Sequence, residues 1–369
     1  MDSVGNSRRP NFLIIVADDL GYSDTGPFGS EVKTPALDKL AQTGMRLTNF
    51  HTASACSPTR SMLLSGTDNH IAGLGQMTEH MASKEAYQNR PGYEGYPNFS
   101  VAALPEILQD AGYETIMSGK WHLGLTKETA PSARGFDKSF TFLSGCCNHY
   151  NYEPQLDDPS HSIFTPMNAG EFWMKDGAYL DRKKDLPANF YSTTSFTDQL
   201  IGYLSERKNS QKPFFAYLPF TAPHWPLQAP AEVIAEGVYD EGPGVLRSKR
   251  LQALISLGIV PKDTEPAPMT HELWDSLSAE ERAKSARAME VYAAMVDLID
   301  RSIGRVVDHL EKMGELDNTF ILSMSDNGAE GSLLEAIPIM GGETTVNAII
   351  NKYYNNSLKN MGAGDSYVW

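Results

Sequence analysis

A lone thiol, Cys56, lies in the stretch SACSPTRSMLLSG (54–66), two residues before a proline and four before an arginine. The chain has only three cysteines, and the other two are the adjacent pair Cys146 and Cys147. Cys56 therefore has no obvious disulfide partner and no second thiol at metal-ligand spacing. At a helix N-terminus beside an arginine, such a thiol could be a nucleophile of lowered pKa, as in a cysteine hydrolase. The residues alone equally allow a buried, inert cysteine.

Oxygen-bearing side chains follow two apolar runs that have the character of strands. FLIIVA (12–17) is followed by Asp18 and Asp19. Far along the chain, FILSMS is followed by Asp326 and Asn327. Ligands of open α/β sheets bind beyond the C-terminal ends of the strands, and such oxygens suit Ca²⁺ or Mg²⁺. Either pair alone is better explained as a turn, but the two together favour a metal site.

These groups need a scaffold, and the sequence predicts an α/β fold with a mostly parallel central sheet flanked by helices. Thr34 is the expected N-cap of the first helix, with Pro35 at its first position. Lys120 and His122 follow one of the expected strands and add polar groups to the same edge of the sheet. The expected strands are 12–17, 113–119, 213–220 and 318–325, and the expected helices are 34–44, 58–64, 104–112, 196–209 and 278–314.

Two stretches interrupt the alternation of strands and helices. Residues 145–195 are rich in Asn, Asp, Pro and Tyr, and residues 226–277 are rich in Pro and charge. Long insertions of this kind usually form loops over a site. We therefore expect residues 1–369 to form one α/β catalytic domain, with these two insertions as loops over the site.

The formal net charge of −15 argues against nucleic acid or an anionic membrane as the main partner. Arg8 and Arg9 before FLIIVA resemble the start of a signal peptide, but the apolar run is short and ends in aspartates. No run approaches the length that spans a membrane. With three cysteines and no export signal, the sequence predicts a reducing, cytoplasmic setting.

The stretch around Cys56 matches a family pattern. It resembles the sulfatase signature C-x-P-x-R-x-x-x-L-x-G, and further family motifs follow in the family's order along nearly the whole chain. The similarity is greatest to bacterial-type arylsulfatases, which are formylglycine-dependent members of the alkaline phosphatase-like superfamily. The matching segments are Asp18-Asp19, 56–66, 112–124, 221–226 and 325–328.

The resemblance implies hydrolysis of small sulfate esters, in particular aryl sulfates, and it gives Cys56 a role. In that family a separate maturation enzyme oxidises the cysteine to formylglycine, and Pro58 and Arg60 belong to its recognition code. The aldehyde hydrates to a geminal diol, of which one hydroxyl can attack sulfur and displace the alcohol. The second hydroxyl, once deprotonated, lets the carbon return to the aldehyde and expel sulfate. A serine could form the sulfate ester but could not release it in this way.

The resemblance also implies a metal and an anion site. Arg60 and Lys120 would neutralise sulfate oxygens and the alkoxide, which is usually the largest catalytic contribution. The metal would be Ca²⁺ rather than Mg²⁺, held by Asp18, Asp19, Cys56 in its oxidised form, Asp326 and Asn327.

Two histidines receive catalytic roles from the same resemblance. His122 would contact the formylglycine hydroxyl and assist its breakdown, and His224 would contact sulfate near the leaving oxygen. His224 could instead be a structural histidine in the proline-constrained loop TAPHWP. Four further residues lie near the motifs without an assigned role, namely His51, His70, Asn148 and His149.

The sequence departs from the family toward its C-terminus. The family has one more sulfate-binding lysine downstream of Asp-Asn-Gly, followed by a small C-terminal domain. Lys352 and Lys359 do not match the context of that lysine. We therefore expect a C-terminally truncated sulfatase that lacks the small domain. A phosphonate or phosphate monoester hydrolase of the same superfamily and a non-catalytic anion-binding remnant remain as alternatives.

Overall fold

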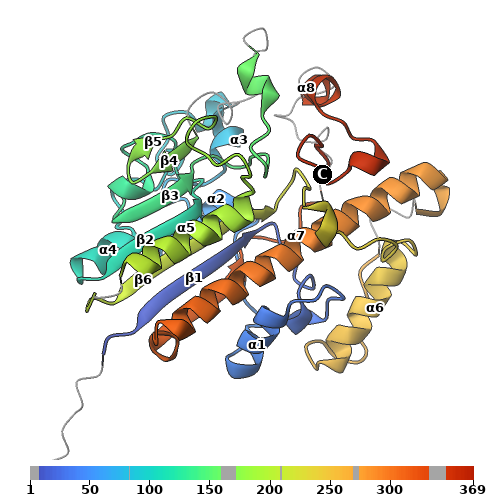
Figure 1. The fold of residues 1–369 in the computed structure, drawn as a ribbon, viewed down its shortest axis with the longest axis horizontal. Helices are drawn as coiled ribbons and strands as arrows, with labels where there is room; N and C mark the ends of the chain where they lie inside the picture. Colours follow the sequence, from blue (N-terminus) through green and yellow to red (C-terminus); the bar gives the residue numbers. More distant parts are fainter. Residues whose placement is uncertain (1–7, 83, 159–171, 208–209, 269–273, 332–345) are drawn as a thin grey trace, which may run out of the picture.

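The computed structural model describes residues 8–369 except 83, 159–171, 208–209, 269–273 and 332–345. Within these residues, one seven-stranded sheet forms the middle of the molecule, with the order β5-β4-β3-β2-β6-β1-β7 (Figure 1). Strands β3, β2, β6, β1 and β7 run parallel, and β4 and β5 add an antiparallel edge. The strands are β1 (Asn11–Asp18), β2 (Glu114–Lys120), β3 (Lys138–Phe142), β4 (Trp173–Lys175), β5 (Ala178–Tyr179), β6 (Phe214–Pro223) and β7 (Thr319–Ser325).

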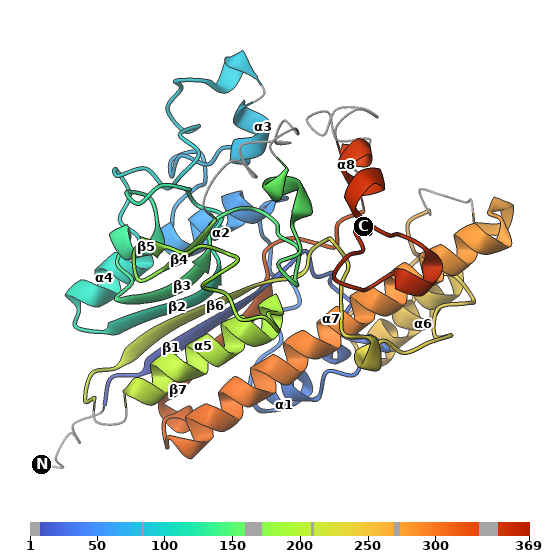
Figure 2. The same cartoon turned by 45° about the horizontal axis from the view of Figure 1, so that its top comes forward.

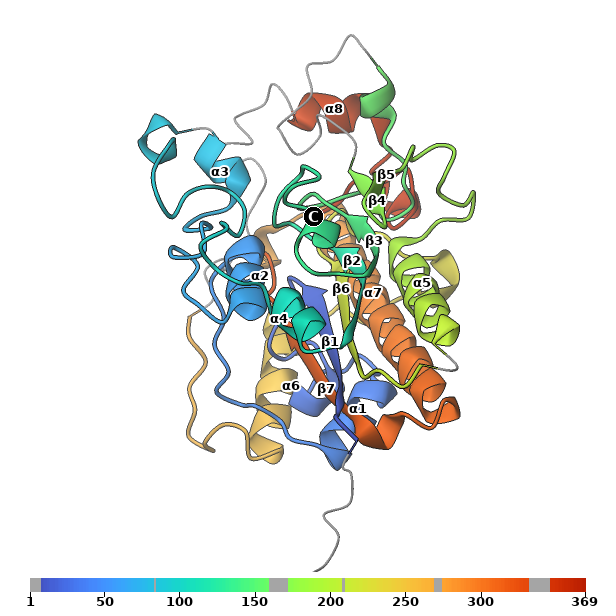
Figure 3. The same cartoon turned by 90° about the vertical axis from the view of Figure 1, so that its left-hand side faces the viewer.

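Helices cover both faces of the sheet, as a parallel sheet requires. Helices α5 and α7 pack on one face, and α2 and α4 pack on the other, as the view along the sheet shows (Figure 3). None of the described helices combines the length and apolarity needed to cross a bilayer. The helices are α1 (Pro35–Thr43), α2 (Cys56–Ser65), α3 (Thr78–Ala82), α4 (Leu104–Asp110), α5 (Ser192–Glu206), α6 (Pro243–Ser256), α7 (Ala279–Lys312) and α8 (Val346–Tyr353).

Strand β1 shows how the sequence specifies this layering. Its side chains alternate between the two faces, because successive residues of a strand point in opposite directions. Leu13 and Ile15 pack with α5 and α7, whereas Ile14 and Val16 pack in the core beneath α2 and α4. All four are buried, which explains the continuous apolar run.

The sheet order brings distant parts of the chain to one edge. Strand β1 lies between β6 and β7, and β2 lies on the other side of β6. In the register, Ala17 pairs with Ser325, and Asp18 pairs with Pro223. The C-terminal ends of these parallel strands therefore meet. The segment that ends at Trp369 packs on the loop after β6, where the amide of Leu227 donates to the carbonyl of Val368 (Figure 2).

The predicted fold class is confirmed, but the interpretation of the two insertions as loops alone needs correction. Strands β4 and β5 lie within 145–195 and extend the sheet, and α6 lies within 226–277. Strands β4 and β5 have three and two residues and are too short to show the alternation of apolar and polar residues that marks a strand. The sequence analysis also did not predict β3.

The start of α1 also differs from the expectation. Thr34 occupies the N-cap position, but its hydroxyl accepts the amide of Gly26 at 2.8 Å and makes no capping bond. The cap comes from Asp300 on α7, whose carboxylate accepts the amides of Ala36 at 3.0 Å and Leu37 at 2.8 Å. A buried side chain from a neighbouring helix thus satisfies the free amides of the first turn.

Replacing Asp300 by alanine should lower the free energy of unfolding by about 1–3 kcal/mol, because two amides of α1 lose their acceptor. Urea denaturation measures this change. Asp308 lies at an exposed position of the same helix, and Asp308→Ala should change the same quantity by less than about 0.5 kcal/mol. An equal decrease in the free energy of unfolding in the two variants would show that the hydrogen bonds from Asp300 to α1 do not stabilise the protein.

Candidate active site

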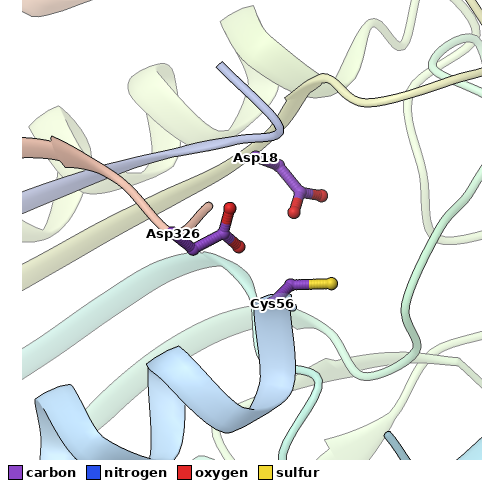
Figure 4. A group of neighbouring side chains, drawn as sticks. All are labelled: Asp18, Cys56 and Asp326. Carbon is purple, nitrogen blue, oxygen red and sulfur yellow. The ribbon is translucent and has the colours of Figure 1, made fainter. Parts of the chain in front are cut away.

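Two carboxylates and a thiol converge where β1, β7 and α2 meet. Asp18 ends β1, Asp326 follows β7, and Cys56 is the first residue of α2 (Figure 4). One oxygen of each carboxylate and the Cys56 Sγ all lie within 4.8 Å of one another. All three side chains are buried. Parallel pairing of β1 with β7 thus brings together residues that are about 300 positions apart in the sequence.

Asp19 and Asn327 join this cluster. Asn327 Nδ2 donates to Asp19 Oδ1 at 2.6 Å, and the Asp19 amide donates to Asp326 Oδ1 at 3.2 Å. Asp19 has φ +63°, a left-handed conformation that turns the chain sharply at the end of β1. The structure therefore brings all four predicted oxygen-bearing residues to one place.

Two buried cations face these carboxylates. Arg60 donates from Nε to Asp326 Oδ2 at 2.9 Å and from Nη2 to Asp18 Oδ1 at 3.2 Å. Lys120 Nζ lies 2.8 and 2.6 Å from the two oxygens of Asp18. Burial alone would lower the pKa of Lys120, but the nearby anionic groups, Asp18 foremost, together raise that pKa, so the ammonium stays charged. Buried charges of this kind are tolerated only when they are paired.

The donor set fits a hard divalent cation. The centre has an excess of negative charge, because it holds three carboxylates and only two cationic side chains. These are Asp18, Asp19 and Asp326, with Arg60 and Lys120. Among the described residues, Asn327 Oδ1 is a buried acceptor without a hydrogen-bond donor. An orphaned acceptor beside carboxylates is the arrangement that a bound cation would satisfy.

The environment of Cys56 argues against the cysteine-hydrolase alternative. Burial raises the pKa of its thiol well above the ordinary value, and Asp18 and Asp326 add to this effect although Lys120 opposes it. The thiolate is the nucleophilic form of cysteine, so this environment disfavours the reactive form of an unmodified thiol.

The two predicted histidines lie in different surroundings. His224 Nδ1 donates to the carbonyl of Trp225 at 2.7 Å, and its Nε2 lies 3.5 Å from Asp19 Oδ2. His122 Nε2 lies 3.1 and 3.3 Å from the two oxygens of Glu79. His224 thus contacts the carboxylate cluster, whereas the hydrogen bonds of His122 run to a residue that sequence reasoning missed.

His149 receives a position that the sequence alone did not assign. It is buried behind His224, and its Nε2 donates to the His224 carbonyl at 3.0 Å. Its Nδ1 accepts the hydroxyl of Ser192 at 2.7 Å, and Ser192 accepts from Thr221 at 3.1 Å. Burial lowers the pKa of His149 to about 4. A neutral imidazole therefore holds the backbone of the His224 loop.

A second group of side chains supports the loop after Asp19. The Gly21 amide donates to Asp24 Oδ2 at 2.9 Å, and the Tyr292 hydroxyl donates to the same oxygen at 2.6 Å. Arg250 of α6 forms an ion pair with Asp24 and bonds Glu31 at 2.8 Å. Helix α6, inside the second insertion, is thereby tied to the loop that carries Asp19.

The remaining candidates are exposed or bonded to other residues. Lys352 pairs with Asp158 at 3.0 Å on the surface, and Lys359 is exposed. His51 and His70 are exposed, whereas Asn148 is buried and donates to the carbonyl of Gly364 at 2.7 Å.

The sheet order and the charged centre at its strand ends place the chain in the alkaline phosphatase-like class of α/β proteins. Within that class the chain belongs to the sulfatase family, because the Sulfatase family model matches residues 10–357. The family predicted from the sequence is confirmed.

Known sulfatases resemble the chain over nearly all of its length. An uncharacterised sulfatase of Schizosaccharomyces pombe is 56% identical over 98% of this chain and 64% of the relative. An arylsulfatase of Klebsiella aerogenes is 36% identical over 98% of this chain and 74% of the relative. The solved structure of Ps i-CgsB in complex with k-i-k-neocarrahexaose has a TM-score of 0.62 at 26% identity, over 87% of this chain and 59% of that one. The chain thus spans less than two thirds of two of these proteins.

The buried His149 predicts a specific pH dependence of stability. Its pKa is 6.5 ordinarily and about 4 in the folded protein, so between these values the unfolded chain binds more protons. The free energy of unfolding should therefore fall as the pH is lowered from about 6.5 to 4, by up to about 3 kcal/mol from this group.

His149→Gln should remove that part of the slope in denaturant titrations at a series of pH values. His51→Gln, which replaces an exposed histidine, should keep the slope of the unmodified protein. An unchanged slope in His149→Gln would contradict the assignment of a buried neutral imidazole.

Proposed function

We propose that this sulfatase hydrolyses sulfate esters, with small aryl sulfates as its substrate class. The observation that carries the proposal is the position of Cys56 at the start of α2, beside Asp18 and Asp326 and near two buried cations. The relative from Klebsiella aerogenes, named an arylsulfatase, supports the substrate class.

Cys56 acts in this proposal as formylglycine, made by a separate maturation enzyme. That group supplies a hydrated aldehyde, with one hydroxyl to attack sulfur and a second to allow release of sulfate. Because Cys56 is buried, the maturation enzyme has to reach it before folding is complete or through local opening. The raised pKa of the unmodified thiol supports the need for conversion.

The neighbouring side chains have roles that follow from charge. Arg60 and Lys120 are the cations near position 56, and they would bind sulfate oxygens and stabilise the negative charge that develops there. His122 would exchange a proton with the hydroxyl at position 56. His224, beside Asp19, would contact sulfate near the leaving oxygen. The insertions 145–195 and 226–277 would shape the approach to this site within one catalytic domain.

Ca²⁺ is the metal that we propose for the oxygen cluster. When bound, it would polarise the nucleophilic hydroxyl and a sulfate oxygen. Asp18, Asp19, Asp326 and Asn327 would hold it, and the orphaned Oδ1 of Asn327 supports this assignment. Carboxylate and amide oxygens, joined by the oxygen of Cys56 in its oxidised form, favour a hard cation, and the resemblance to arylsulfatases favours calcium over magnesium.

The first test of this function is chemical. In protein made together with a maturation enzyme, peptide mass spectrometry should find an aldehyde at position 56, and Cys56→Ala should lose aryl sulfate turnover. Cys146→Ala, which removes a cysteine outside the cluster, should keep most of the turnover. An unmodified thiol at full occupancy in active protein would refute the proposal, and faster turnover of phosphate than of sulfate esters would refute the substrate class.

The second test concerns the metal. Calcium at 100 times its Kd should stabilise the protein by about 2.7 kcal/mol, because it binds the folded state only. Thermal melting should show this increase in the unmodified protein and in Asp308→Asn, but it should be largely lost in Asp19→Asn. A larger shift with Mg²⁺ than with Ca²⁺ would reverse the metal assignment, and equal calcium shifts in all three proteins would exclude this site.

A further inference from the structure

Glu79 forms a buried pair with one of the proposed catalytic histidines. It lies on the short helix α3, 43 positions before His122 in the sequence. Both of its carboxylate oxygens are within hydrogen-bond distance of His122 Nε2, at 3.1 and 3.3 Å. The side chains are only 12% and 6% exposed. The carboxylate therefore faces the imidazole where little water competes for either group.

The pair fixes where the proton of the ring is held. Burial alone would raise the pKa of Glu79, but its interactions with His122, a backbone hydrogen bond and the nearby Lys120 together lower that pKa to about 2. Glu79 is therefore an ionised acceptor without a proton to donate, and Nε2 of His122 has to be the donor. In a neutral ring this leaves Nδ1 without a proton. Among the residues that the structure describes, that Nδ1 is buried and has no hydrogen-bond partner.

The backbone restricts the same ring from its other end. His122 has φ +55°, a left-handed conformation that is uncommon for residues other than glycine. Its amide donates to the carbonyl of Leu143 at 3.1 Å, which ties it to the strand end beside Lys120. The main chain at His122 is thus fixed at the end of β2, and Glu79 contacts the ring at Nε2.

We propose that Glu79 is a positioning residue, which holds His122 as the Nε2–H tautomer so that Nδ1 is free to exchange a proton with the hydroxyl at position 56. The inference rests on the proposed function, since that hydroxyl belongs to formylglycine. When the proton moves from the hydroxyl oxygen to Nδ1, the ring becomes positively charged and the Glu79 carboxylate at Nε2 balances that charge. The proton returns to water when the site is regenerated. Partners that orient a metal-bound histidine typically change activity by about 10–100-fold when removed, and we expect an effect of that size for Glu79.

A purely structural role is the competing explanation, in which the ion pair only fastens α3 to the end of β2. The two explanations differ in what happens when His122 is absent. A positioning residue acts only through its histidine, so its removal costs nothing further once the histidine is gone. A structural residue affects folding and activity whether or not His122 is present.

The experiment is a double-mutant cycle on the matured protein with an aryl sulfate as substrate. Glu79→Gln should lower kcat about 10–100-fold and change KM by less than about threefold, with formylglycine content and calcium-induced stabilisation unchanged. In the His122→Ala background the same substitution should change the rate by less than about twofold. Glu85→Gln, a charge-matched change at an exposed position nearby, should leave kcat unchanged. Equal losses from Glu79→Gln in the two backgrounds would overturn the proposal.

A second measurement needs neither turnover nor a stable Glu79 variant. Ring ¹⁵N NMR of the unmodified protein, with the His122 signals assigned by their loss in His122→Gln, reports which nitrogen is protonated in the neutral ring. We expect the proton on Nε2, and a proton on Nδ1 would overturn the proposal. If sulfate esters are not hydrolysed but the Nε2–H tautomer is found, the proposed function fails while the pairing with Glu79 stands.

Discussion

The structure depends on the balance of charge among four buried groups, three at the ends of β1, β2 and β7 and one on α2. Removing a charged side chain from water costs several kcal/mol unless a partner compensates it. Asp18 contacts both buried cations, Arg60 and Lys120, and Asp326 contacts Arg60. These contacts require β1 to lie beside β7, α2 to begin beneath both strands, and β2 to end within reach of Asp18. The strand order is therefore also the condition for a stable charged centre.

The strands that carry the centre could be predicted because each has seven or more residues; β1, β2 and β6 are largely buried, whereas the edge strand β7 is only partly buried. The runs that became β1, β2, β6 and β7 are apolar and end in polar residues, so position at a strand end could be inferred directly. The order of the strands in the sheet could not be inferred from their positions in the sequence, because about 300 residues separate β1 from β7. The family resemblance supplied that adjacency. Strands β4 and β5 escaped prediction because two or three residues carry no measurable period.

Two residues around the centre were missed, and a third was noticed without a role, for a different reason. Glu79 and Asp24 were missed and His149 was left unassigned because their importance comes only from what the fold places beside them. The same holds at the start of α1, where local sequence pointed to Thr34 and the fold supplied Asp300. Local motifs thus identify functional residues when the residues that act with them are close in sequence or belong to a known family pattern. Contacts between distant segments become visible only in three dimensions.

The present pairing of Lys120 also explains how cation and anion binding would be linked in the proposed function. Its ammonium bonds both oxygens of Asp18, so a sulfate group has to compete with that carboxylate for the same donors. A divalent cation beside Asp18 would compensate the negative charge of the carboxylate and weaken its hold on the ammonium. Lys120 would then be available to a sulfate oxygen without leaving a buried carboxylate unpaired. The charge balance that stabilises the fold would in this way favour substrate binding after the metal is in place.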